Sequence, residues 1–169
     1  MQEVNSYYGV MQSVGSICAV YASTSGNTEW VVEQVVHVWQ EAGITVELHR
    51  AEQADPNIWK QYDTFLLATS TWDHGAINPF FSVLFEELKN TDCHNKRAAF
   101  IGMGDVRYEP VLFCGGMESL KNRWIERGGT AVSTPLKFNG EPFAKYDAVI
   151  KPWADALLKL INVNPENGS

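Results

Sequence analysis

Five short apolar segments alternate with segments of helical periodicity, and this alternation constrains the fold more than any other feature. Residues 64–68 (TFLLA) show no polar alternation, which is typical of a strand covered on both faces. Further strands are predicted at 17–21, 45–49, 98–103 and 130–138. Helices are predicted over 28–41, 79–88, 116–128 and 149–161. This order predicts an α/β domain with five parallel strands and right-handed crossovers, and Pro135 places the last strand near an edge.

The length of 169 residues suits one domain, which the pattern places at 17–161. Residues 1–16 then form an N-terminal extension, and the polar residues 162–169 form a flexible C-terminal tail. The first sixteen residues contain no Lys or Arg and no long apolar stretch, so they do not resemble a signal peptide. No apolar run approaches the roughly 18 residues of a membrane-spanning helix, and we expect a cytoplasmic protein without membrane insertion.

Charge and cysteine content argue against several kinds of site. The formal net charge is −7, which disfavours binding to nucleic acid or to an anionic membrane surface. The three cysteines, Cys18, Cys93 and Cys114, have no CxxC spacing, so they give neither a disulfide framework nor a zinc signature. No metal site is predicted.

The first loop, residues 23–28 (STSGNT), joins a predicted strand to a predicted helix. Its hydroxyl groups gather where the free N–H groups and the dipole of a helix N-terminus favour an anion. Gly26 permits close approach of the backbone. The loop has neither a Walker lysine nor a GxGxxG fingerprint, which favours a single phosphate held by neutral donors. An ordinary Ser/Thr-rich turn that caps the helix is the alternative, and it remains open.

Two further loops follow predicted strands. Residues 69–75 (TSTWDHG) contain Trp72, which core packing explains poorly in so polar a loop. Its ring either stacks on a planar ligand or folds back over the edge of the sheet. Residues 102–108 (GMGDVRY) bring glycines that permit close backbone approach, and Tyr108 is a second exposed aromatic candidate. Parallel sheets bind ligands beyond the carboxyl ends of their strands, which is where all three loops are expected.

These three loops, in this order, resemble those of the flavodoxin family. Residues 23–28 followed by Glu29 are similar to the family's phosphate signature. The Thr71-Trp72 loop and the 102–108 loop are similar to the two loops that hold the flavin ring. Residues 113–116 (FCGG) are similar to the start of the family's next helix. The resemblance extends from about residue 17 to 161. It implies a flavodoxin-like doubly wound sheet of order 2-1-3-4-5 with helices on both faces, of the short-chain type, and noncovalently bound flavin mononucleotide (FMN).

The resemblance also implies a role for each site residue. The FMN phosphate is assigned to Ser23, Thr24, Ser25, Gly26, Asn27 and Thr28, with Ser70 assisting. Trp72 and Tyr108 are expected to sandwich the flavin ring. The polar edge of the ring is assigned to the backbone around Thr71, Asp73, His74, Gly75, Gly104, Asp105 and Cys114.

Several features depart from the family pattern. Tyr108 and Cys114 are separated by two more residues than expected, and Pro110 and Val111 are the extra ones. The segment after Trp72 is less acidic than usual, and Arg107 adds a positive charge to the next loop. Four glutamates are expected on solvated helix faces: Glu29, Glu33, Glu86 and Glu87.

The function implied by the resemblance is that of a low-potential one-electron carrier between a flavodoxin or ferredoxin reductase and an acceptor enzyme. Such a protein is a monomer and needs no catalytic acid or base, because the flavin does the chemistry. An FMN-dependent NAD(P)H:quinone reductase on the same fold is one alternative, although aromatic rings on both flavin faces argue against it. A flavin-free interaction module is the other.

Overall fold

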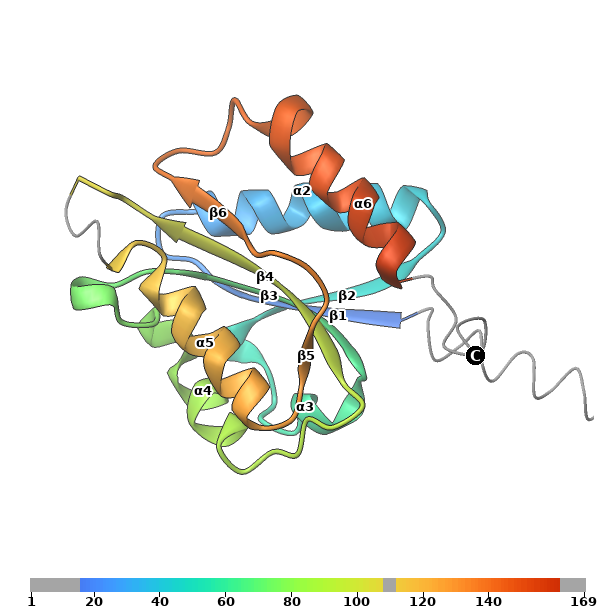
Figure 1. Cartoon of the computed structure of the whole chain (residues 1–169), viewed down its shortest axis with the longest axis vertical. Helices are drawn as coiled ribbons and strands as arrows, with labels where there is room; N and C mark the ends of the chain where they lie inside the picture. Colours follow the sequence, from blue (N-terminus) through green and yellow to red (C-terminus); the bar gives the residue numbers. More distant parts are fainter. Residues whose placement is uncertain (1–15, 108–111, 162–169) are drawn as a thin grey trace, which may run out of the picture.

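A parallel sheet forms the centre of the computed structural model, which describes residues 16–107 and 112–161 (Figure 1). Its order is β2-β1-β3-β4-β5, and β6 also pairs with β4. The strands are β1 (Ser16–Ala22), β2 (Thr45–Arg50), β3 (Thr64–Ser70), β4 (Arg97–Gly104), β5 (Thr130–Ala131) and β6 (Leu136–Asn139). The predicted parallel sheet and its order 2-1-3-4-5 are therefore confirmed.

The fifth predicted strand is split in two. β5 pairs with β4 up to Ala98, and β6 resumes the pairing at Ile101. The four residues 132–135 thus lie opposite only two residues of β4, and this edge of the sheet is irregular. Pro135 lies in this stretch and has no N–H to donate to the ladder, so the uninterrupted strand predicted over 130–138 was wrong.

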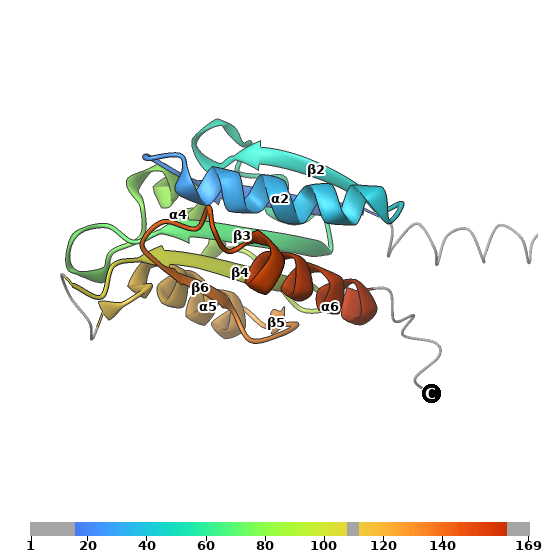
Figure 2. The same ribbon diagram turned by 90° about the horizontal axis from the view of Figure 1, so that it is seen from above.

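The helices cover both faces of the sheet (Figures 1 and 2). On one face lie α2 (Asn27–Glu41) and α6 (Lys151–Ile161), the latter preceded by a π-helical turn, η5 (Tyr146–Ile150). On the other lie α3 (Ile58–Gln61), α4 (Ser82–Leu88) and α5 (Gly115–Glu126). Short 3-10 turns are η1 (Ala51–Gln53), η2 (Asp73–Gly75) and η3 (Pro79–Phe81). The short helix α3 was not predicted, because one turn of helix carries too few apolar positions to show a period.

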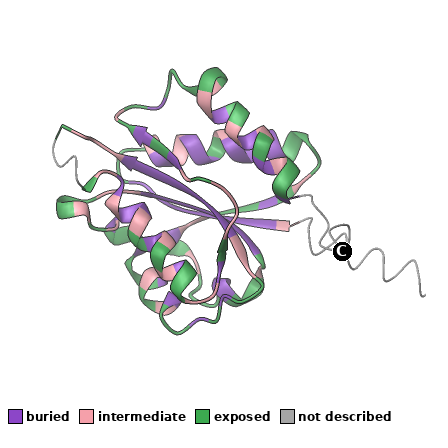
Figure 3. Ribbon diagram, in the orientation of Figure 1, coloured by how far each residue is buried: buried purple, intermediate pink, exposed green. Residues whose placement is uncertain are grey.

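Alternate residues of the central strands enter two separate cores. In β3, Leu66 packs in the core under α2 and α6, whereas Phe65 and Leu67 pack in the core under α3, α4 and α5. Side chains on both faces are buried, so residues 65–68 are apolar without alternation, as the run 64–68 predicts. Figure 3 shows the central strands buried along most of their length.

Within each helical layer, a buried tryptophan connects two neighbouring helices through its indole N–H group. Trp39 in α2 donates to the carbonyl of Ala154 in α6, at 2.9 Å. Trp59 in α3 donates to the carbonyl of Leu84 in α4, at 3.0 Å. Each ring therefore fills core volume and also satisfies its polar atom.

The register of the strands brings three loops to one edge of the sheet. Ala22 at the end of β1 is paired with Thr69 of β3, and Thr69 is paired with Gly102 of β4. Neighbouring strands lie about 4.8 Å apart, so the loops that follow these residues begin side by side. Among the helices of residues 16–107 and 112–161, none combines the length and the apolar character needed to cross a membrane.

Replacing Leu67 by Ala tests the importance of the doubly covered strand. Leu67 is fully buried, so we expect the variant to lose about 2–5 kcal/mol of unfolding free energy, measured by urea unfolding. Val83→Ala, at a side chain that is 60 % exposed, is the control and should change stability by less than about 0.5 kcal/mol. Equal losses in the two variants would contradict this description of the core.

Candidate functional site

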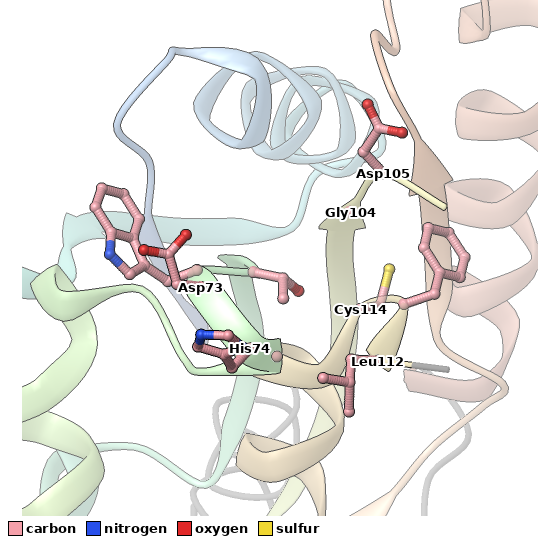
Figure 4. Close-up of a pocket in the computed structure, with 10 residues that line it drawn as sticks. Asp73, His74, Gly104, Asp105, Leu112 and Cys114 are labelled. Carbon is pink, nitrogen blue, oxygen red and sulfur yellow. The ribbon is translucent and has the colours of Figure 1, made fainter. Parts of the chain in front are cut away.

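A cavity of about 460 Å³ opens at the carboxyl edge of the sheet, between the loops that follow β3 and β4 (Figure 4). This volume is in the range of small-molecule sites. Eight of the predicted site residues line it: Thr71, Trp72, Asp73, His74, Gly75, Gly104, Asp105 and Cys114. Leu112 and Phe113 also line it, although neither was predicted as a site residue.

The loop after β3 is a small hairpin that carries one wall of the cavity. Thr71 forms an antiparallel bridge with Ile77, and the N–H of Ala76 donates to the carbonyl of Asp73 at 3.2 Å. His74 has φ 56° and ψ 33°, and Gly75 has φ 75°. These values define a type I′ turn, which needs positive φ at both central residues.

Trp72 lies at the start of this turn with its side chain 45 % exposed. A tryptophan so exposed contributes little to the core, and its large face is open to a ligand. The hairpin thus presents an aromatic ring at the cavity rather than burying it.

Beside the cavity, the backbones of neighbouring loops are in direct contact, and glycine is required at three positions. A Cβ atom on Gly115 would lie 2.7 Å from the carbonyl oxygen of Gly75, and one on Gly104 would lie 2.9 Å from the nitrogen of Cys114. A Cβ on Gly116 would lie 2.9 Å from the carbonyl oxygen of Ser70. Larger residues would push these loops apart.

The segment before α5 closes the cavity on the other side. Leu112 packs on the hairpin at Gly75. A Cβ atom built on Gly75 would lie only 2.9 Å from the Cβ atom of Leu112. Leu112 directly follows the two extra residues of this loop, and a large apolar residue in an unusually long loop is the sequence signal that could have identified it. Tyr108, expected to stack on the second face of a ring, lies outside the described residues.

Cys114 is the N-cap residue of α5, with φ 55° and a fully buried side chain. Burial raises the pKa of its thiol to about 11, so the thiol is protonated at neutral pH. A protonated, buried thiol is a poor nucleophile. Cys114 therefore shapes the cavity wall and does not supply reactive chemistry.

The loop of residues 23–28 lies at the same edge of the sheet but does not line the cavity. The N–H of Gly26 donates to Ser23 Oγ at 3.0 Å, and the carbonyl of Gly26 accepts the first helical hydrogen bond, from Trp30. Gly26 has φ 91° and is the N-cap residue, so no side chain at this position caps α2. No capping side chain therefore accepts from the first-turn N–H groups of α2, and such groups can donate to an anion.

Ser70, predicted to assist at the phosphate, lies at the end of β3. Its hydroxyl accepts a hydrogen bond from Asn78 Nδ2 at 2.7 Å. Asn78 is fully buried and also caps the following turn, since its Oδ1 accepts from the N–H of Phe80 at 2.9 Å. Ser70 therefore helps to anchor the chain beyond the hairpin.

One carboxylate at the cavity, that of Asp105, forms an ion pair with Arg107. Arg107 holds Asp105 through two guanidinium nitrogens, with Nη2 2.6 Å from Oδ2 and Nε 3.0 Å from Oδ1. These hydrogen bonds hold the pKa of Asp105 below its usual range, so the carboxylate is ionised at neutral pH. Across residues 16–107 and 112–161, no group of three His, Cys, Asp or Glu side chains is placed to bind a metal ion.

Glu29 corrects one expectation. It was predicted on a solvated helix face, but its side chain is only 26 % exposed. Its carboxylate accepts a hydrogen bond from the Tyr21 hydroxyl at 3.0 Å and forms an ion pair with Arg50. The periodicity of α2 could not reveal these partners, because both come from strands.

Comparison with known proteins agrees with this geometry. The family model described as flavodoxin matches residues 20–153. The chain belongs to the flavodoxin family. It is 35 % identical to a flavodoxin of Nitratidesulfovibrio vulgaris over 83 % of this chain and 95 % of the relative. The crystal structure of oxidised flavodoxin 2 from Bacillus cereus has 30 % identity and a TM-score of 0.79, covering 85 % of this chain and 98 % of its own.

The turn at His74 gives a test of the hairpin in this member of the flavodoxin family. A left-handed backbone costs a residue with a Cβ roughly 1–2 kcal/mol, whereas glycine costs about 0.5–1 kcal/mol in chain entropy. We therefore expect His74→Gly to raise the unfolding free energy by about 0.5–1 kcal/mol in urea unfolding. Asp73→Gly is the matched control and should lower it, since Asp73 does not have positive φ. A loss of stability in His74→Gly would refute the type I′ turn.

Proposed function

We propose that this protein binds one FMN noncovalently and carries electrons between a reductase and an acceptor enzyme. The observation that supports this most strongly is the pairing of two features at one edge of the sheet. One is an open helix N-terminus at residues 23–28, suited to a phosphate. The other is a cavity with the exposed Trp72 on its wall, suited to a flat ring.

The residues present fit the two ends of FMN. The phosphate end would be held by the N–H groups and hydroxyls of residues 23–28, where Gly26 leaves open space. The ring would lie against Trp72, in the cavity that Gly75 and Gly104 also line. Its polar edge would meet the backbone of residues 71–75 and 104–105. Tyr108 remains the predicted partner for the second face of the ring.

FMN, when bound, supplies the electron-transfer chemistry, and the chain supplies binding and electrostatics. The ionised Asp105 places a negative charge near the cavity, and Arg107 compensates it. The neutral thiol of Cys114 adds no charge to the cavity wall.

A quinone reductase on the same fold is the second candidate. Such an enzyme needs room for a substrate ring on one face of the flavin. Here the large side chains of Trp72, Leu112 and Phe113 line a cavity of about 460 Å³ and would lie against the flavin itself. This favours a carrier that reacts through the ring edge. Mixing the FMN-loaded protein with NADPH alone in a stopped-flow instrument separates the two, because rapid direct reduction would favour the enzyme.

We also propose that the protein works as a monomer with redox proteins as partners. The net charge of −7 favours partners with a basic surface, through electrostatic steering. Trp72 and Leu112, both partly exposed at the cavity, supply an apolar centre for such a contact.

The absorption spectrum of the purified protein tests the cofactor. We expect a flavin spectrum, one FMN released per chain on denaturation, and no binding of FAD by the FMN-free protein. A protein that remains colourless after incubation with FMN would refute the proposal and favour a flavin-free interaction module.

Replacing Trp72 by Ala tests the stacking role. By comparison with aromatic stacking on nucleic acid bases, we expect a loss of roughly 1–3 kcal/mol in FMN affinity, measured by fluorescence titration. Phe80→Ala is the matched control, because Phe80 is equally exposed but does not line the cavity. Unchanged affinity in Trp72→Ala would move the stacking role to another residue.

A further inference from the structure

A partly exposed charge cluster lies beside the loop of residues 23–28. Glu29, in the first turn of α2, forms an ion pair with Arg50 at the end of β2. The Tyr21 hydroxyl donates to Glu29 Oε2 at 3.0 Å, and the Arg50 guanidinium lies 5.5 Å from the centre of the Tyr21 ring. Arg50 Nη1 is also 3.6 Å from Glu52 Oε1. The guanidinium of Arg50 thus interacts with two carboxylates, those of Glu29 and Glu52.

The topology places this cluster at the candidate phosphate loop. Tyr21 and Arg50 are register partners in β1 and β2, and the loop begins two residues after Tyr21. Glu29 follows the loop directly, in the third residue of α2. A helix rises 1.5 Å per residue, so the Glu29 backbone lies within roughly one turn of the N–H groups that would hold a phosphate.

This arrangement creates an electrostatic conflict that Arg50 resolves. A carboxylate in the first turn is favourable toward the helix dipole, but it repels an anion bound at the same N-terminus. The loop itself contains no Lys or Arg to offset this repulsion. The Tyr21 hydroxyl remains a neutral donor, because burial and its hydrogen bond to Glu29 raise its pKa to about 12. Arg50 therefore supplies the positive charge that offsets Glu29, and its closer ion pair is with Glu29 rather than Glu52.

We propose that Arg50 sets the preference of this protein for a phosphorylated flavin by neutralising Glu29. The inference rests on the proposed binding of FMN and adds a residue outside the loop to it. Arg50 acts through Glu29 and is a positioning residue, since its guanidinium is held between two carboxylates and the Tyr21 ring. A residue with only a structural role would affect FMN and riboflavin alike, because the two ligands differ only in the phosphate.

The test measures the affinities of the flavin-free full-length protein for FMN and for riboflavin, by fluorescence titration. In Arg50→Gln, we expect the ratio of FMN to riboflavin affinity to fall roughly twofold to sixfold. The larger figure is the unscreened interaction of one unit charge with a phosphate of charge near −2 at about 8 Å in a water-like medium, and the smaller figure includes screening by salt. In Glu29→Gln the ratio should rise, and in the double variant it should return close to the wild-type value.

Two further variants sharpen the test. Arg50→Lys keeps the charge and should keep most of the wild-type ratio. Arg107→Gln is the matched control, because it also releases a carboxylate, Asp105, but at the loop after β4. It should change both affinities by a similar factor.

The outcomes separate this inference from the proposed function. Wild-type protein that binds neither flavin would refute the proposed function. Wild-type protein that prefers FMN, with the same preference in Arg50→Gln and Glu29→Gln, would overturn only the role of Arg50. If Arg50→Gln does not fold, Glu29→Gln decides alone, since an unchanged or lower ratio in that variant overturns the inference.

Discussion

The burial of β1, β3 and β4 on both faces is the constraint on which the rest of the structure depends. Strands covered by helices on two sides must be almost entirely apolar, and parallel strands need a crossover for each connection. Polar groups are thereby excluded from the strands and gathered in the loops at the strand ends. Because the strands are parallel, the loops after β1, β3 and β4 meet at one edge. The site is a consequence of the topology before any ligand is considered.

Close contact between backbones then fixes the shape of the site. The hairpin after β3 and the start of α5 touch through Gly75 and Gly115, and Gly116 donates its N–H to Thr71 Oγ1 at 3.3 Å. Side chains at these positions would separate the two loops. The non-glycine residues His74 and Cys114 adopt left-handed backbones at the same cavity, with φ 56° and 55°. Such strain is typical of functional sites, where the surrounding structure holds a conformation that the residue alone would avoid.

Local patterns in the sequence predicted what depends on neighbours along the chain. The alternation of apolar and helical segments predicted the parallel sheet, and the loop of residues 23–28 follows β1 as expected, whereas its phosphate-binding role stays a prediction. Features that depend on contacts distant in sequence were missed. Leu112 packs against Gly75 of a different loop, and Glu29 of α2 forms an ion pair with Arg50 of β2. Periodicity within one element cannot predict either partner. Pro135 was recognised as an edge residue, but the length of the break around it depends on the pairing with β4.

A protein with a net charge of −7 faces a physical difficulty in holding an anionic ligand, and the site meets it with paired charges. Asp105 is held by Arg107 at the ring loops, and Glu29 by Arg50 beside the phosphate loop. Each pair cancels a carboxylate close to where the ligand would lie, while the rest of the surface stays acidic. Charges separated by more than the Debye length, about 8 Å at physiological ionic strength, are largely screened. The local pairs would therefore have the larger electrostatic effect on a ligand bound there, and the overall negative charge would act mainly on the proposed protein partners.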